Sequence, residues 1–159
     1  MQIHGLNKTT LLDYPEHVAA TVFTGGCNFC CPFCHNGDLV LHPGEFPVIS
    51  EEEVIAFLKK RKNILSGVCI TGGEPTLQPD LADFIRKIKE LGLLVKLDTN
   101  GTNPDMLEAL AQEGLLTREE IAAQPWGAEP TRVDYSALYA HRLALLATDA
   151  LLRIRWRLS

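Results

Sequence analysis

Four cysteines stand within eight positions of the sequence, in the stretch TGGCNFCCPFCHN at residues 24–36. They are Cys27, Cys30, Cys31 and Cys34, and a fifth cysteine, Cys69, stands apart from them. In a reducing compartment, clustered thiols favour metal binding or catalysis over a disulfide framework. Because Cys30 and Cys31 are adjacent, the four cannot all do the same job.

The cluster supports two interpretations. Cys27, Cys31 and Cys34 form a C-x3-C-x2-C pattern, and three thiolates suit an iron–sulfur cluster that leaves one iron without a cysteine. All four cysteines also form two interleaved C-x2-C pairs, which would hold one zinc ion only if so short a loop could wrap it. Cys69 lies in an apolar run, where a role as a small buried hydrophobic residue is favoured.

The composition narrows the class of protein. The chain has 159 residues, 46% of them hydrophobic and 22% charged, which suits one domain with a sizeable core. A net charge of -5 argues against partners such as nucleic acid or an anionic membrane surface. The first residues, MQIHGLNKTT, lack the apolar core of a signal peptide. We therefore expect a cytoplasmic protein that contacts neither nucleic acid nor a membrane.

Three apolar runs, each ended by a turn that contains glycine, predict buried strands at 17–24, 67–71 and 93–99. Helical patterns fill the gaps between and after them. One begins at a Ser50/Glu53 capping box, one covers 79–91, and one begins with Asn103 as N-cap and stops at Gly114. Alternating units of this length predict an α/β fold with a parallel sheet.

A motif whose residues could bind a cofactor or take part in a reaction follows each predicted strand. The cysteines follow the first strand, TGGEP follows the second and DTNG follows the third. Parallel α/β folds place their functional sites at the carboxyl ends of the strands. The three motifs, although far apart in the sequence, are therefore expected to meet at one end of the sheet.

Together these motifs resemble the radical S-adenosylmethionine superfamily. The resemblance rests on C-x3-C-x2-C with Phe33 before the last cysteine, on GGEP, and on LDTNG. Residues 5–36, GLNKTTLLDYPEHVAATVFTGGCNFCCPFCHN, are more closely similar to the activating proteins of anaerobic ribonucleoside-triphosphate reductases. The resemblance covers about residues 1–116, which we expect to form the core of a shortened, partial (β/α) barrel.

The resemblance implies the cofactors and the chemistry. Cys27, Cys31 and Cys34 would hold a [4Fe-4S] cluster, and S-adenosylmethionine would chelate its fourth iron. One electron, from a reductant such as flavodoxin or ferredoxin, would cleave S-adenosylmethionine to methionine and a 5′-deoxyadenosyl radical. That radical would take a hydrogen atom from a glycine of the partner, an anaerobic ribonucleoside-triphosphate reductase. The resemblance assigns no catalytic residue of the protein itself.

It also implies a set of residues around the cofactors. Phe33 would stack on the adenine ring, while Gly72 and Gly73 would let the backbone approach the methionine part closely. Glu74 would accept a hydrogen bond from the ammonium group of the cofactor. Without the cysteines, however, GGEP would be read only as a turn before a helix.

The remaining expected site residues carry weaker signals. Asp98 and Thr99 match positions that help to bind a cation in glycyl-radical activating enzymes, although an ordinary turn at a strand end explains them equally well. His35 follows the last cysteine and would tune the cluster without ligating it. Cys30 departs from the family pattern, and we expect a spectator thiol that is open to oxidation.

The resemblance ends after residue 116. The last lysine of the chain is Lys96. The segment 117–159 contains six arginines and no lysine, and so lacks a lysine motif expected in the next strand. We expect 117–159 to be a divergent, helical tail. Two rival functions remain open: an enzyme of the same superfamily acting on a small molecule, similar to 7-carboxy-7-deazaguanine synthase, or a metal-binding remnant without turnover.

Overall fold

The computed structural model describes residues 1–31 and 34–123 of the chain. Within them, five strands form one sheet whose spatial order follows the sequence. β1 runs antiparallel to β2, whereas β2, β3, β4 and β5 are parallel to their neighbours. The strands are β1 Ile3–Thr10, β2 Ala19–Thr24, β3 Gly67–Gly72, β4 Leu94–Thr99 and β5 Ile121–Ala123.

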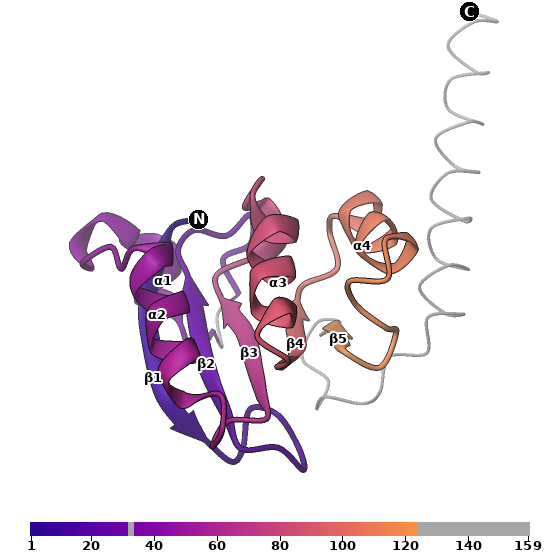
Figure 1. Cartoon of the computed structure of the whole chain (residues 1–159). Helices are drawn as coiled ribbons and strands as arrows, with labels where there is room; N and C mark the ends of the chain where they lie inside the picture. Colours follow the sequence, from indigo (N-terminus) through magenta and orange to yellow (C-terminus); the bar gives the residue numbers. More distant parts are fainter. Residues whose placement is uncertain (32–33, 124–159) are drawn as a thin grey trace, which may run out of the picture.

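Helices connect the parallel strands, and Figure 1 shows α2 and α3 lying in front of the sheet. Ser50 caps α2 by accepting the Glu53 N–H at 3.1 Å, and Asn103 caps α4 by accepting the Met106 N–H at 3.3 Å. Both starts agree with the sequence prediction. The helices are α1 Gly37–Leu41, α2 Glu51–Arg61, α3 Leu81–Glu90 and α4 Pro104–Gln112, with short 3-10 turns η1 Pro43–Glu45 and η2 Pro75–Leu77.

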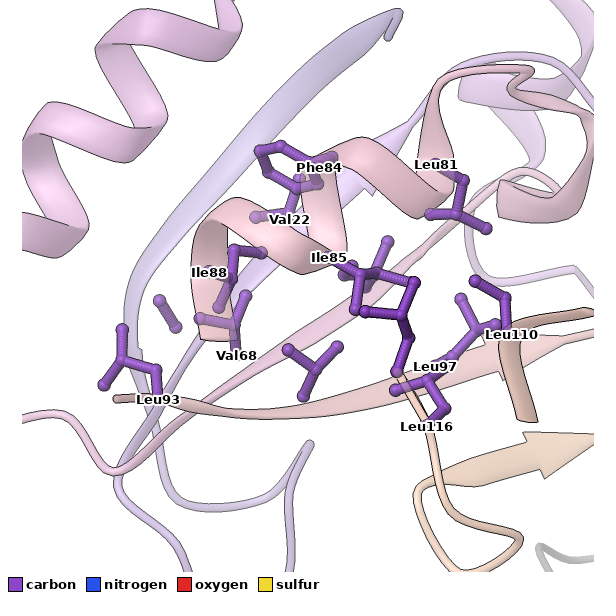
Figure 2. Packing of buried hydrophobic residues seen from close by; sticks show 14 of the residues in the cluster. Val22, Val68, Leu81, Phe84, Ile85, Ile88, Leu93, Leu97, Leu110 and Leu116 are labelled. Carbon is purple, nitrogen blue, oxygen red and sulfur yellow. The ribbon is translucent and has the colours of Figure 1, made fainter. Parts of the chain in front are cut away.

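The hydrophobic core lies between the helices and one face of the sheet. Alternate strand residues such as Val22, Val68 and Leu97 are fully buried there. Phe84 and Ile85 of α3 pack over them, as Figure 2 shows. Each such side chain contributes roughly 1.5–3 kcal/mol by leaving water, so this layer is what holds the strand ends in place.

The opposite face of the sheet is polar. Thr21, Cys69 and Lys96 lie side by side on it, because β2, β3 and β4 pair in that register. The connection between β1 and β2 crosses this face: the Asp13 carboxylate accepts the Thr21 hydroxyl, and the Asp13 carbonyl accepts the Lys96 ammonium at 2.8 Å. These contacts fix that connection against the amino-terminal half of the parallel strands.

The structure confirms the predicted α/β class and adds elements that the sequence did not indicate. The strands predicted at 17–24, 67–71 and 93–99 are β2, β3 and β4, with ends shifted by at most two residues. The antiparallel strand β1 and the helix α1 were not predicted. Residues 121–123 of the expected tail form β5 beside β4, and residues 124–159 lie outside the described part. No helix in the described part is long and apolar enough to cross a membrane.

Candidate functional site

The three loops that follow β2, β3 and β4 meet at one end of the sheet, as the sequence predicted. The Gly73 N–H donates to the Thr24 carbonyl and the Glu74 N–H to the Gly26 carbonyl, both at 2.8 Å, which joins the second loop to the first. The Asn100 amide reaches the Cys27 sulfur at 3.7 Å, which joins the third loop to the first. The backbone, not the side chains alone, therefore brings the motifs together.

The cysteines differ in their exposure. Cys27, Cys31 and Cys34 are partly buried, Cys30 is exposed and Cys69 is buried. Among residues 1–31 and 34–123, no three His, Cys, Asp or Glu side chains surround a single metal position. In a cubane cluster, however, each cysteine binds a different iron, so its ligands need not surround one point. Three partly buried thiols in one loop are a donor set that fits such a cluster.

Cys27 has the most structured environment of the three. Its sulfur accepts the Phe29 backbone N–H at 3.4 Å as well as the Asn100 side-chain amide. Burial raises the pKa of the Cys27 thiol, and the negative charges of Glu74 and Cys34 raise it further, while the two hydrogen bonds oppose this shift. A metal must therefore displace the proton when it binds, as at other thiolate sites.

Two glycines allow the second loop to approach the first. Gly72 has a φ of +113°, a conformation that side-chain-bearing residues rarely adopt. A Cβ atom on Gly73 would lie 1.9 Å from the Gly26 carbonyl oxygen, so only glycine fits there. Asn36, which closes the cysteine loop, donates to the Gly72 carbonyl at 3.1 Å. The glycines thus act in packing the two loops together, whether or not they also contact a cofactor.

Glu74 is fully buried and its carboxylate is already well supplied with donors. One oxygen accepts the Thr76 N–H at 2.9 Å, the Thr76 hydroxyl at 2.5 Å and the Thr99 hydroxyl at 2.7 Å. The other oxygen accepts the Asn100 N–H at 2.6 Å. In this arrangement Glu74 links the loops after β3 and β4, and the expected bond to an ammonium group would have to be added to these four.

Asp98 and Thr99 point to opposite faces of β4. Thr99 is buried and belongs to the Glu74 network. Asp98 lies on the polar face, where its two oxygens contact the Lys96 ammonium at 2.6 Å and the Cys69 thiol at 3.3 Å. The structure therefore does not gather the two expected cation-binding side chains at one point, and the cation beside Asp98 is Lys96.

The remaining predicted residues divide between the described and the undescribed parts. His35 lies in an exposed turn just before α1. Phe33, and with it the expected stacking on adenine, lies outside the described residues. Cys69 is buried as predicted, and burial, reinforced by the Asp98 carboxylate, raises the pKa of its thiol far above the usual range. Cys69 is therefore a protonated thiol at neutral pH.

Sequence reasoning missed several residues of this end of the sheet. Asn28, Asn100 and Thr102 form a closed set of hydrogen bonds next to Cys27, although DTNG was read only for its aspartate and threonine. A cleft of about 660 Å³ also opens beside Cys27, and nothing in the sequence pattern indicated it. Its lining consists of Met1, Gln2, Gly25, Gly26, Cys27, Leu77, Gln78, Pro79 and Asp80.

Comparison with known proteins assigns the chain to a family. The family model of the radical SAM superfamily matches residues 21–125, which include all three motifs. The chain belongs to the radical SAM superfamily, whose cofactors are a [4Fe-4S] cluster and S-adenosylmethionine. QueE from Escherichia coli has the same fold, with a TM-score of 0.54 over 89% of this chain and 90% of its own, at 18% identity.

Two relatives in sequence carry different functional names. A protein of Methanocaldococcus jannaschii, named as a candidate glycyl-radical enzyme activating enzyme, is 38% identical over 116 residues, which are 72% of this chain and 46% of that protein. A candidate GTP 3′,8-cyclase of Saccharolobus islandicus is 40% identical over 77 residues, 47% of this chain and 24% of the cyclase. The chain thus spans less than half the length of these relatives.

Proposed function

We propose that this chain is a glycyl-radical activating enzyme whose partner is an anaerobic ribonucleoside-triphosphate reductase. The observation that carries the proposal is the meeting of the cysteine, GGEP and DTNG loops, and it is supported by 38% identity over 116 residues to a candidate glycyl-radical enzyme activating enzyme. The sequence of residues 5–36, which resembles the reductase activating proteins, supports this choice of partner.

The residues of the chain have definite tasks in this function. Cys27, Cys31 and Cys34 would hold the [4Fe-4S] cluster, and Gly72 and Gly73 keep the second loop close to them. When bound, the cluster and S-adenosylmethionine would supply the radical chemistry by which a glycine of the partner loses a hydrogen atom. The cofactors carry out the radical chemistry, and the residues at this end of the sheet bind and orient them.

A second candidate function has its own support. The similarity to a GTP 3′,8-cyclase, 40% identity over 77 residues, suggests chemistry on a small molecule. The activating role is preferred because the similarity to the candidate activating enzyme extends over 116 residues, against 77 for the cyclase. The two functions differ in which molecule becomes the radical. In the activating role it is a glycine of a partner protein, and in the second function it is a free small molecule.

An anaerobic activation assay tests the proposal. The reconstituted protein is mixed with S-adenosylmethionine, dithionite and a purified anaerobic ribonucleoside-triphosphate reductase, and glycyl radical is measured by electron paramagnetic resonance. We expect a glycyl-radical signal that Cys27→Ala abolishes and Cys30→Ala, which changes an exposed thiol, preserves. Formation of 5′-deoxyadenosine without any glycyl radical would instead favour a small-molecule substrate, and no cleavage at all would favour a remnant.

A further inference from the structure

The side chain of Asn100 has only one orientation that satisfies its neighbours. Its Oδ1 accepts the Thr102 backbone N–H at 3.0 Å and the Thr102 hydroxyl at 2.7 Å. A backbone N–H can only donate, so this contact must face the amide oxygen and not the NH2 group. The NH2 group is therefore turned towards the cysteine loop.

The two hydrogens of that NH2 group have two acceptors. One is Asn28 Oδ1 at 2.9 Å, and the other is Cys27 Sγ at 3.7 Å, a length that suits a hydrogen bond to the large sulfur atom. Asn28 is itself held, because its own NH2 group donates to the Thr102 hydroxyl at 2.8 Å. Asn28, Asn100 and Thr102 thus form a ring in which each amide is fixed by the others.

The backbone of Asn100 is fixed as firmly as its side chain. The buried Glu74 carboxylate accepts the Asn100 N–H at 2.6 Å and, through its other oxygen, the hydroxyl of the preceding Thr99 at 2.7 Å. Hydrogen bonds to an ionised group are about twice as strong as neutral ones, so this anchor is stiff. The loop after β3 thereby sets where the loop after β4 presents its amide to Cys27.

From this arrangement we propose that Asn100 is a positioning residue that sets the reduction potential of the iron–sulfur cluster by donating an N–H to the sulfur of Cys27. The inference rests on Cys27 as a cluster ligand and not on the identity of the substrate, so it stands or falls separately from the activating function.

A hydrogen bond to the Cys27 sulfur affects the reduction potential because reduction makes the cluster more negative. Reduction adds one electron, and part of that negative charge resides on the cysteine sulfurs, where an N–H donor stabilises it. Hydrogen bonds to the sulfurs are among the factors that set the potentials of iron–sulfur clusters, and each raises the potential. Cys27 accepts two such bonds, from the Phe29 backbone and from Asn100, and only the second can be removed by changing a side chain. Asn100 therefore makes the cluster easier for a donor to reduce.

The test compares Asn100→Ala with Asn7→Ala in the reconstituted 159-residue protein. Asn7 is exposed on β1, where it pairs with Thr21 of β2 and its side-chain oxygen accepts the Thr9 N–H of the same strand, so Asn7→Ala is the matched change of one asparagine. The readout is the midpoint potential of the cluster, from a titration followed by electron paramagnetic resonance without S-adenosylmethionine, at equal iron content.

We expect Asn100→Ala to shift the midpoint potential to a more negative value and Asn7→Ala to leave it unchanged. Asn100→Ser, which keeps a polar residue in the loop but cannot reach Cys27, should shift it in the same direction. An unchanged potential in both Asn100 variants, or an equal shift in Asn7→Ala, would overturn the proposal. Failure of both Asn100 variants to assemble a cluster would overturn it too, since Asn100 would then be needed for assembly and not for tuning.

Discussion

At the scale of single residues, the site is organised by hydrogen bonds to two acceptor groups, the Cys27 sulfur and the Glu74 carboxylate. Asn100 touches both, through its side chain and its backbone. The Glu74 carboxylate accepts four hydrogen bonds from within the protein, so its first task is to hold loops together. A Glu74 variant would therefore disturb Asn100 as well as any contact with S-adenosylmethionine.

Ligand identity can be tested by iron content. Cys27→Ala, Cys31→Ala and Cys34→Ala should each lose most of the iron that the reconstituted protein holds, about four atoms per cubane cluster. Cys30→Ala should retain it, because Cys30 is exposed and falls outside the three-thiol spacing. Iron and sulfide analysis after anaerobic reconstitution measures this. Binding of a single zinc ion that Cys30→Ala releases would instead support the four-thiolate interpretation.

Thiol reactivity should separate Cys69 from Cys30 in the metal-free protein. Cys69 is fully buried and the pKa of its thiol is raised, so its reactive thiolate form is scarce near neutral pH. Cys30 is exposed and should be alkylated by iodoacetamide within the first minutes, whereas Cys69 should react only after the fold is opened by denaturant. Mass spectrometry of peptides gives the two rates. Equal rates under native conditions would contradict the burial of Cys69.

At the scale of elements, the packing of the loops after β2 and β3 depends on the absence of one carbon atom. Gly73→Ala would drive a Cβ to within 1.9 Å of the Gly26 carbonyl, which is itself bonded to the Glu74 N–H. We expect a loss of about 2–4 kcal/mol in the free energy of unfolding, at the severe end for single substitutions. Thermal or denaturant unfolding of the metal-free protein, followed by circular dichroism, measures the change.

Gly37→Ala is the matched control for this change. Gly37 is the first residue of α1, and a Cβ there would meet nothing within 4 Å. Because alanine is the better helix former, the control should be neutral or should stabilise the protein by up to about 1 kcal/mol. Similar losses in the two variants would show that the clash at Gly73 relaxes and that the two loops are not closely packed in solution.

The elements also show why some parts of the fold were predictable and others were not. β2, β3 and β4 are apolar runs ended by glycine-containing turns, and their burial on the helix-covered face produces that pattern. β1 was missed because Asn7, Lys8 and Thr9 are exposed in it, which removes the apolar signal of a buried strand. Such an antiparallel strand at the edge of the sheet is defined by its pairing with β2, which the sequence alone does not display.

The same distinction applies to the candidate site. The meeting of the three motifs followed from topology alone, because the carboxyl ends of parallel strands share an edge. The role of Asn100 did not, since DTNG is equally typical of a turn, and the bond to Cys27 depends on how two loops pack against each other. The pairing of Lys96 with Asp98 was missed for a similar reason: residues two apart on a strand share a face, but only the structure shows that they touch.

At the scale of the whole molecule, the described chain is a two-layer structure with one apolar interface. α2 and α3 lie in front of the sheet (Figure 1), and together with α4 they contribute to a single core against it. The other face carries the row Thr21, Cys69 and Lys96. The apolar core thus lies on one face of the sheet and the polar row lies on the other face. The site lies at the carboxyl ends of the parallel strands that separate these two faces. Stability should therefore be greatest where strands are bonded on both sides and covered by helices.

Hydrogen exchange should reveal this gradient along the sheet. β3 pairs with β2 over six residues and with β4 over four, and Val68, Cys69 and Ile70 within it are fully buried. β5 has only three residues and pairs with β4. Amide hydrogens in regions with many buried contacts exchange only when the whole fold opens, whereas those in short, weakly supported elements exchange through local opening.

We expect β3 amides to exchange most slowly and β5 amides to exchange fastest. The β1 amides should exchange at an intermediate rate, because the pairing of β1 with β2 is irregular. Exchange of the metal-free protein, measured by mass spectrometry or nuclear magnetic resonance, gives the order. Protection of β5 equal to that of β3 would contradict a sheet whose stable centre is β2–β4, and would extend the cooperative unit to its far edge.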